Sequence, residues 1–319
     1  HFDVAVFTNL TPEHIEAHGG FENYKKAKGK LFEALAHAKK KTINGNRIEK
    51  IAVVNTDNEH GHYFLQFPAD TTYGFSVQGT CVLPPSANHT CVSASAVVVS
   101  PEGVSFDVET TKFRMHLLGQ FNVENALCAA VTAKSLGVAF SVAASALAKI
   151  EEIPGRMKFI REGQRFTAII DFAHTPSSFE GVFAVMKQLK DPHGRIIAVF
   201  GSAGGGRDKW KRPELGRIAA RTADHIILTA DDPYEEDIDV ICAEIQKGID
   251  SEVFKGKVEV ISNRREAITT ALHMARWNDI VLFLGKGTEQ TLMIGTESVS
   301  WNEESIVIEE IRNMLYDRK

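Results

Sequence analysis

The chain has 319 residues, of which 44% are hydrophobic and 24% charged, a composition typical of a folded protein with a sizeable core and room for two domains. Its net charge of -5 argues against binding to nucleic acid through phosphate contacts. No apolar run reaches the roughly 18 residues of a membrane span, and no signal peptide is visible, so a cytoplasmic protein without membrane insertion is expected. Cys81 and Cys91 could face each other across a hairpin, but buried free thiols are expected in this compartment.

The beginning of the chain predicts a strand, a turn-rich loop and a helix. Residues 4–7 (VAVF) form an apolar run with β-branched members, and residues 21–40 carry apolar side chains at helical spacing. His14 is therefore expected beyond the carboxyl end of the strand, and Lys28 on the first turns of the helix. In an α/β sheet, ligands bind at this position.

The rest of the chain predicts two domains with a boundary near Pro154-Gly155, at 1–152 and 153–319. In the first, a strand and turn are expected over 51–57, further short strands over 63–67, 97–99 and 112–118 in an antiparallel flank, and helices from about 120 and over 141–150. In the second, strands are expected over 166–170, 195–200, 225–229, 256–260 and 280–284, and helices over 213–222, 236–248, 263–276 and 303–317. This alternation predicts a Rossmann-like α/β domain.

Several motifs follow these predicted strands. They are FTNLTPEH at 7–14 with NYKKAK at 23–28, GQFNVEN at 119–125, PGRM at 154–157, DFAHTP at 171–176, FGSAGGGRDK at 200–209 with KRP at 211–213, DDPY at 231–234 and GKGTE at 285–289. The glycine-rich turn alone is weak evidence for a phosphate cradle, and it is not a Walker A motif. Together, the motifs resemble those of the Mur ligases, the ATP-dependent amino-acid-adding enzymes of cell-wall synthesis, and most of all the MurE type.

The resemblance implies a partial P-loop-type mononucleotide-binding ATPase domain over 1–152, followed by a Rossmann-like α/β domain. It makes His14 and Lys28 ligands of Mg2+, with Lys28 carrying a CO2-derived carbamate whose oxygen suits a hard cation. Asn122 and Asn125 would contact the adenine of ATP, because an amide offers both a donor and an acceptor; capping of the helix by Asn122 is the alternative. The other implied roles are nucleotide contacts for Arg156 and Asp171, a place near the reacting phosphate for His174, and contacts to the incoming amino acid for Arg207, Asp231, Asp232, Gly285 and Glu289.

The segment DDPY departs from the DNPR of ligases that add meso-diaminopimelate, in which the arginine binds the distal carboxylate. Tyr234 replaces that arginine, and Asp232 replaces the asparagine. A pocket that loses a cation and gains carboxylates favours an ammonium group, so a lysine-like amino acid is expected. The acids at 235–237 could belong to this pocket. They could equally form the solvated N-terminal turn of the predicted helix 236–248, where negative charge is favoured.

The resemblance implies a monomeric enzyme that uses ATP and Mg2+ to add an amino acid to UDP-N-acetylmuramoyl-dipeptide through an acyl phosphate, in peptidoglycan synthesis. Mur ligases begin the central domain with a GTxGK[TS] phosphate loop, preceded by a UDP-binding domain, and neither is present here. A truncated and inactive ligase is therefore expected. Cyanophycin or folylpolyglutamate synthetase-like ligases and a non-catalytic ligand-binding homologue are the alternatives.

Overall fold

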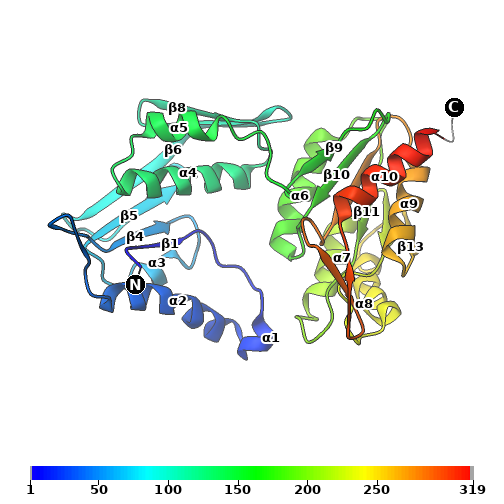
Figure 1. Cartoon of the computed structure of the whole chain (residues 1–319), viewed down its shortest axis with the longest axis horizontal. Coiled ribbons are helices and arrows are strands. Elements are labelled where there is room, and N and C mark those ends of the chain that lie inside the picture. The colour runs from blue at the N-terminus through cyan, green and yellow to red at the C-terminus, as the bar shows by residue number, and fades with distance from the viewer. Residues whose placement is uncertain (1, 317–319) are drawn as a thin grey trace. The chain divides into compact units, whose positions relative to one another are not determined.

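The computed structural model describes residues 2–316 and divides into two compact units, His1–Glu151 and Glu152–Lys319 (Figure 1). Each unit contains a six-stranded sheet, and each is described by itself. No helix within residues 2–316 combines the length and the apolar character needed to cross a membrane.

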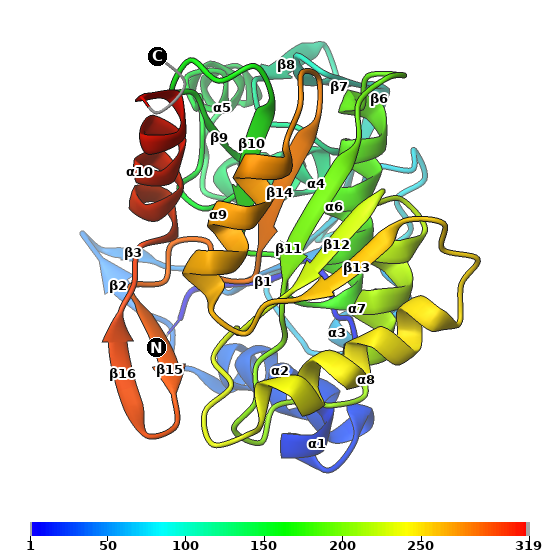
Figure 2. The same ribbon diagram turned by 90° about the vertical axis from the view of Figure 1, so that its right-hand side faces the viewer.

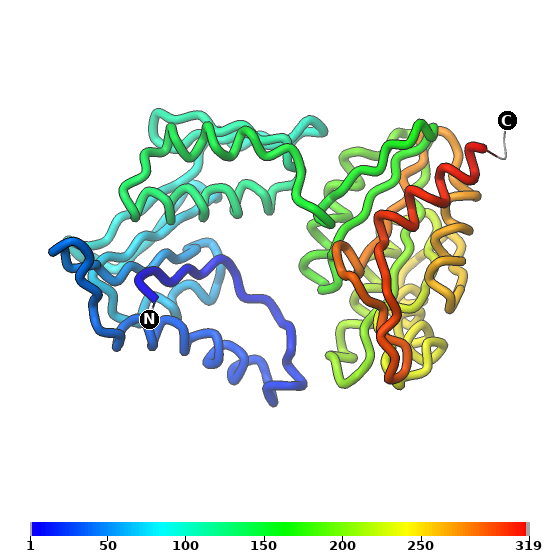
Figure 3. The backbone as a smooth tube through the Cα atoms, viewed as in Figure 1, coloured from blue at the N-terminus to red at the C-terminus, as the bar shows by residue number. Residues whose placement is uncertain are grey.

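The first unit is a sheet in the order β1-β4-β5-β6-β7-β8, parallel from β1 to β6 and antiparallel from β6 to β8. Its strands are β1 (Val4–Phe7), β4 (Ile51–Asn55), β5 (Thr71–Ser76), β6 (His89–Ser100), β7 (Gly103–Val108) and β8 (Thr111–Met115), and a small hairpin joins β2 (Thr42–Ile43) to β3 (Asn46–Arg47). Its helices are α1 (Ile15–His18), α2 (Phe21–His37), α3 (Gly61–Phe64), α4 (Gln120–Ser135) and α5 (Phe140–Leu147). Figure 3 follows the chain from β1 through a loop into α2.

The continuous apolar run of β4 explains why helices cover both faces of this sheet. Ile51 and Val53 pack in a cluster with α4 and α5, whereas Ala52 and Val54 pack in a second cluster with α2 and α3. Since successive side chains of a strand point to opposite faces, a strand without polar alternation must be buried on both.

The strand predicted over 63–67 is wrong, because this segment contains the end of α3. Phe64 and Phe67, one helical turn apart, both approach the ring of Phe32 on α2, with centroids 5.0 and 6.2 Å away. A short apolar run is compatible with either a strand or a helix, and here packing against α2 favours the helix.

The expectation of four free thiols is also wrong, because a disulfide joins Cys81 to Cys91. Cys91 is the neighbour of Gly74 across the sheet, and a Cβ on Gly74 would lie 2.8 Å from the sulfur of Cys81. The absence of a side chain at Gly74 thus leaves space for the Cys81–Cys91 disulfide. Cys128 and Cys242 are buried and free, as expected.

The second unit is a sheet in the order β13-β12-β11-β14-β10-β9, in which only β9 is antiparallel (Figure 2). Its strands are β9 (Lys158–Ile160), β10 (Thr167–Asp171), β11 (Ile196–Phe200), β12 (His225–Leu228), β13 (Lys257–Val260) and β14 (Ile280–Leu284), with a hairpin of β15 (Thr291–Ile294) and β16 (Glu297–Ser300). Its helices are α6 (Pro176–Leu189), α7 (Lys211–Ala220), α8 (Ile238–Asp250), α9 (Arg264–Met274) and α10 (Glu303–Tyr316). The predicted alternation of strands and helices is confirmed, although the β15–β16 hairpin was not predicted.

Candidate functional site

Four parallel strands of the second unit, β10, β11, β12 and β14, end at one edge of its sheet. Ligands of α/β proteins bind at the carboxyl ends of such strands. The side chains at this edge form two groups, one around the ring of Phe172 and the other around the ammonium of Lys286.

The first group surrounds the ring of Phe172. The guanidinium of Arg156 stacks over this ring at 4.6 Å, and the ring of His174 meets it edge-on with centroids 4.9 Å apart. Asp171 is buried, and its two oxygens accept hydrogen bonds of 2.7 Å from two backbone N–H groups, one of them that of Met157. Burial raises the pKa of Asp171, although these hydrogen bonds and the charge of Arg156 oppose the rise. The fold thus brings Arg156, Asp171 and His174 together, and Asp171 fixes the turn that carries Arg156.

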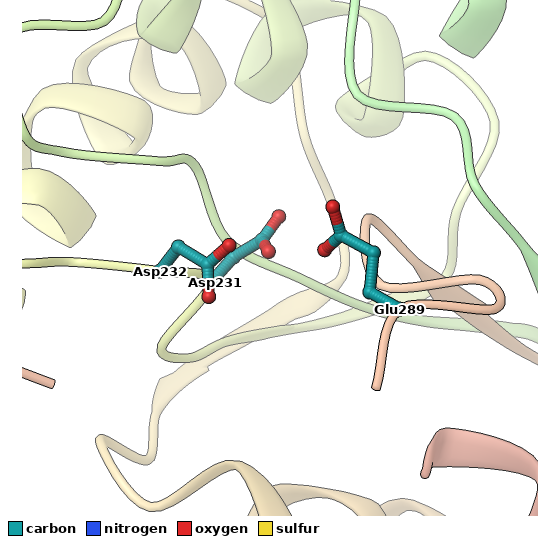
Figure 4. Close-up of side chains that lie close together, drawn as sticks. All are labelled: Asp231, Asp232 and Glu289. Atoms are coloured by element: carbon teal, nitrogen blue, oxygen red, sulfur yellow. The ribbon is translucent and has the colours of Figure 1, made fainter. Parts of the chain in front are cut away.

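The second group is a cluster of carboxylates. Figure 4 shows Asp231, Asp232 and Glu289 converging, and each offers an oxygen within 4.8 Å of the others. Lys286 is fully buried, and its Nζ lies 2.8 Å from Asp232 Oδ1 and 2.7 Å from Glu289 Oε2. The sequence motifs predict no role for Lys286. Its place in GKGTE, directly after a buried strand, was the available signal.

Asp231 is the carboxylate of this cluster that is most removed from water. Burial raises its pKa, although the charges of Arg264 and Lys286 oppose the rise. Gly285 has a φ of 106°, and a Cβ on it would overlap the Oδ2 atom of Asp231. Glycine is therefore required at 285 both by the backbone conformation and by the space that Asp231 occupies.

The loop after β11 lies against the segment that holds Asp232. The carbonyl of Asp232 accepts a hydrogen bond of 2.9 Å from the N–H of Gly204, and its Oδ1 accepts one of 2.8 Å from the N–H of Met293 in β15. The ring of Tyr234 packs against the same glycine-rich loop. Arg207 follows this loop, and within residues 2–316 its guanidinium has no ion-pair partner. The fold therefore places the loop that carries Arg207 beside the predicted selectivity segment.

In the first unit, both predicted metal ligands lie near the ring of Tyr24. The Nζ of Lys28 lies 5.2 Å from the centre of the Tyr24 ring, and the centre of the His14 ring lies 6.2 Å from it. His14 has a left-handed backbone with φ of 54°, a conformation that costs energy for a residue with a Cβ. His14 and Lys28 thus both lie near the ring of Tyr24, and their sharing of an ion stays a prediction from the sequence. An imidazole nitrogen and a carbamate oxygen fit Mg2+ as part of its ligand set.

The asparagines predicted to contact adenine are on α4. Asn122 is buried, and its side-chain amide donates to the backbone carbonyl of Leu118 at 2.7 Å, while its Oδ1 accepts from the side-chain amide of Asn125 at 3.3 Å. Asn122 is not the cap of α4, because Gly119 holds that position. Asn125 is exposed, so its amide oxygen remains open to a ligand. Between the two, burial raises the pKa of Glu124, and the nearby charge of Asp57 raises it further; the sequence motifs do not single out this residue.

Two comparisons with family models cover most of the chain. Residues 1–133 match the Mur ligase middle domain, and residues 155–287 match the Mur ligase glutamate ligase domain. The chain belongs to the Mur ligase family. The family resemblance and the fold class predicted from the sequence are thereby confirmed.

Similar proteins cover nearly the whole of this Mur ligase chain. A UDP-N-acetylmuramyl-tripeptide synthetase of Roseiflexus sp. (strain RS-1) is 41% identical over 95% of the chain and 58% of its own length. A UDP-N-acetylmuramoyl-L-alanyl-D-glutamate--2,6-diaminopimelate ligase of Geobacillus kaustophilus (strain HTA426) is 37% identical over 96% of the chain and 59% of its own length. The chain therefore spans less than two thirds of these relatives.

Solved structures agree with this assignment. A diaminopimelate ligase of the same name is 29% identical with a TM-score of 0.53, over 98% of this chain and 61% of its own. The MurF ligase of Thermotoga maritima in complex with ADP is 17% identical with a TM-score of 0.66, over 99% of this chain and 63% of its own, which shows a shared fold.

Proposed function

We propose that this chain supplies the nucleotide-binding and acceptor-binding parts of a MurE-type ligase, which adds an amino acid to UDP-N-acetylmuramoyl-dipeptide in peptidoglycan synthesis. The observation that carries this proposal is the 41% identity to a UDP-N-acetylmuramyl-tripeptide synthetase over 95% of the chain. The domains at 1–152 and 153–319 would be the central and C-terminal domains of such an enzyme. The cytoplasmic location and the monomeric state remain predictions from the sequence.

In the proposed reaction, ATP phosphorylates the terminal carboxylate of the peptide, and the amino group of the incoming amino acid then displaces phosphate from the acyl phosphate. Mg2+, when bound, would neutralise charge on the phosphates. His14 and carbamylated Lys28 would hold it. The side chains around these groups bind and orient the reactants, which lowers the entropic part of the barrier.

The residues proposed for ATP are Asn125 with Asn122 for the adenine, and Arg156 with Asp171 for the ribose and phosphates. The exposed amide of Asn125 and the stacked guanidinium of Arg156 support these roles. Asp171 would act mainly by holding the turn that presents Arg156, since both of its oxygens already accept backbone hydrogen bonds. His174 would lie near the reacting phosphate.

The acceptor amino acid would lie at the carboxylate cluster, with Arg207 binding its carboxylate. The cluster contains the acids Asp231, Asp232 and Glu289 against the single ammonium of Lys286, because the nearby Arg264 is paired with Glu303. An excess of negative charge favours a ligand with an ammonium group over one with an additional carboxylate. We therefore propose L-lysine, or a similar diamine, rather than meso-diaminopimelate.

The test is a thermal-shift titration of the chain with L-lysine, meso-diaminopimelate and norleucine, which matches lysine in shape without its second ammonium. Lysine should stabilise the chain more than either of the other two, because binding to the folded state alone raises stability. Greater stabilisation by meso-diaminopimelate would overturn the proposed selectivity, and no stabilisation by any of them would overturn the acceptor site. Release of phosphate from MgATP, with the UDP-linked dipeptide and each amino acid, tests turnover.

A further inference from the structure

Lys286 lies within a group of acids that has the arrangement of a metal site. Among residues 2–316, Asp231, Asp232 and Glu289 form a group of three carboxylates close enough to share an ion. Carboxylate oxygens are the ligands that Mg2+, Mn2+ and Ca2+ prefer. The side chain of Lys286 is fully buried, and its ammonium bonds to Asp232 and Glu289 at 2.8 and 2.7 Å.

The amine of Lys286 is charged in this setting. Burial alone would lower its pKa, but the hydrogen bonds to Asp232 and Glu289 raise it on balance. An ammonium between two carboxylates repels a divalent ion and already occupies the oxygen atoms that such an ion would use. Arg264 cannot replace it, because that guanidinium is held by Glu303 and by two backbone carbonyls.

Asp231 differs from its two neighbours. Its carboxylate is buried, yet no residue within 2–316 donates a hydrogen bond to it or forms an ion pair with it. Its oxygens are not fully enclosed, so the ammonium group of a ligand can reach a carboxylate that has no hydrogen-bonded cation of its own among the described residues.

We propose that Lys286 is a specificity-determining residue, a built-in cation that keeps divalent metal ions out of the carboxylate cluster and leaves Asp231 to receive the ammonium group of an amino acid. The second half of this inference rests on the proposed function, and the first half does not. A ligase that works with Mg2+ needs its acceptor pocket to remain free of that ion. Lysine at 286 meets this need with a single charge that cannot diffuse away.

The test measures binding of Mn2+, without ATP or amino acid, by electron paramagnetic resonance titration of the full chain. Lys286→Met and Lys286→Gln should each gain one bound Mn2+, at least about tenfold more tightly than the wild-type chain binds it at this position. Adding Glu289→Gln to either variant should remove the gain. The matched control is Lys257→Met, which removes an exposed lysine that is paired with Glu259 at 2.9 Å; it should gain no site.

Two results would overturn the exclusion of metal. One is a folded Lys286→Met or Lys286→Gln chain, judged by circular dichroism, that gains no Mn2+. The other is anomalous scattering from Mn2+ between Asp231, Asp232 and Glu289 in soaked wild-type crystals. The crystal experiment decides the question even where both variants fail to fold, and unoccupied carboxylates there support the proposal. Titration of the same chains with L-lysine is separate: a wild-type chain that excludes Mn2+ but does not bind lysine would overturn the proposed acceptor, not the role of Lys286 toward metals.

Discussion

Arg264 offers the sharpest test of how the acceptor site is supported. Its side chain is fully buried and makes two hydrogen bonds to Glu303, of 3.0 and 2.6 Å. It also donates to the carbonyls of Ala230 and Leu284, at 3.0 and 2.8 Å. These two residues directly precede Asp231 and Gly285, so one guanidinium ties together the strand ends on which the cluster is built.

The change Arg264→Met should be severe. Within residues 2–316, it leaves the buried carboxylate of Glu303 with the indole N–H of Trp301, 2.7 Å away, as its one remaining side-chain hydrogen-bond donor. Removing one partner of a buried pair costs about 3–5 kcal/mol, because the other charge stays buried without compensation. Replacing both partners, as in Arg264→Met with Glu303→Leu, should cost at least about 1 kcal/mol less than the single change, because no charge is stranded.

The assay is urea unfolding followed by tryptophan fluorescence and far-ultraviolet circular dichroism. All three tryptophans, Trp210, Trp277 and Trp301, belong to the second unit, so fluorescence reports on that unit alone. The control is Arg265→Met, the next residue on α9, whose ion pair with Glu310 is partly exposed and should contribute less than about 1 kcal/mol. An Arg264→Met chain within about 1 kcal/mol of this control would refute the reasoning.

Four further predictions follow from single features. Asp231→Asn should make the chain at least as stable as wild type at pH 7, by urea unfolding, because the raised pKa of Asp231 means that the ionised form opposes folding. This advantage should disappear as the pH falls from the raised pKa toward the ordinary value of 3.8, while binding of lysine should be lost at every pH. Gly285→Ala should destabilise the second unit by about 2 kcal/mol or more in the same assay, since φ of 106° and the oxygen of Asp231 both exclude a Cβ; an unchanged midpoint would contradict this. Reduction of the Cys81–Cys91 disulfide should lower the stability of the first unit by about 2–3 kcal/mol, measured by calorimetry with and without reductant, and alkylation of both cysteines in the unreduced chain would contradict the bond. A carbamate signal should appear in the carbon-13 spectrum of the chain in labelled bicarbonate and be absent from Lys28→Ala; equal signals would contradict a modified Lys28.

The sequence by itself determined the features that depend on neighbouring residues. Apolar runs such as 196–200 and 280–284 predict strands that are buried on both faces of a sheet, and the structure confirms this. The polar motifs lie at the strand ends because they directly follow these runs in the sequence. The family followed from these motifs.

Only the tertiary structure decided which distant side chains meet. The ammonium of Lys286 reaches Asp232 across 54 positions of sequence, because β14 and the segment after β12 end at the same edge of the sheet. The guanidinium of Arg264 reaches Glu303 by the packing of α9 beside α10. Such pairs leave no local periodicity, since their geometry depends on strand order and helix packing. The composition of the cluster was therefore predictable from DDP and GKGTE, but the pairing of Lys286 with two of its acids was not.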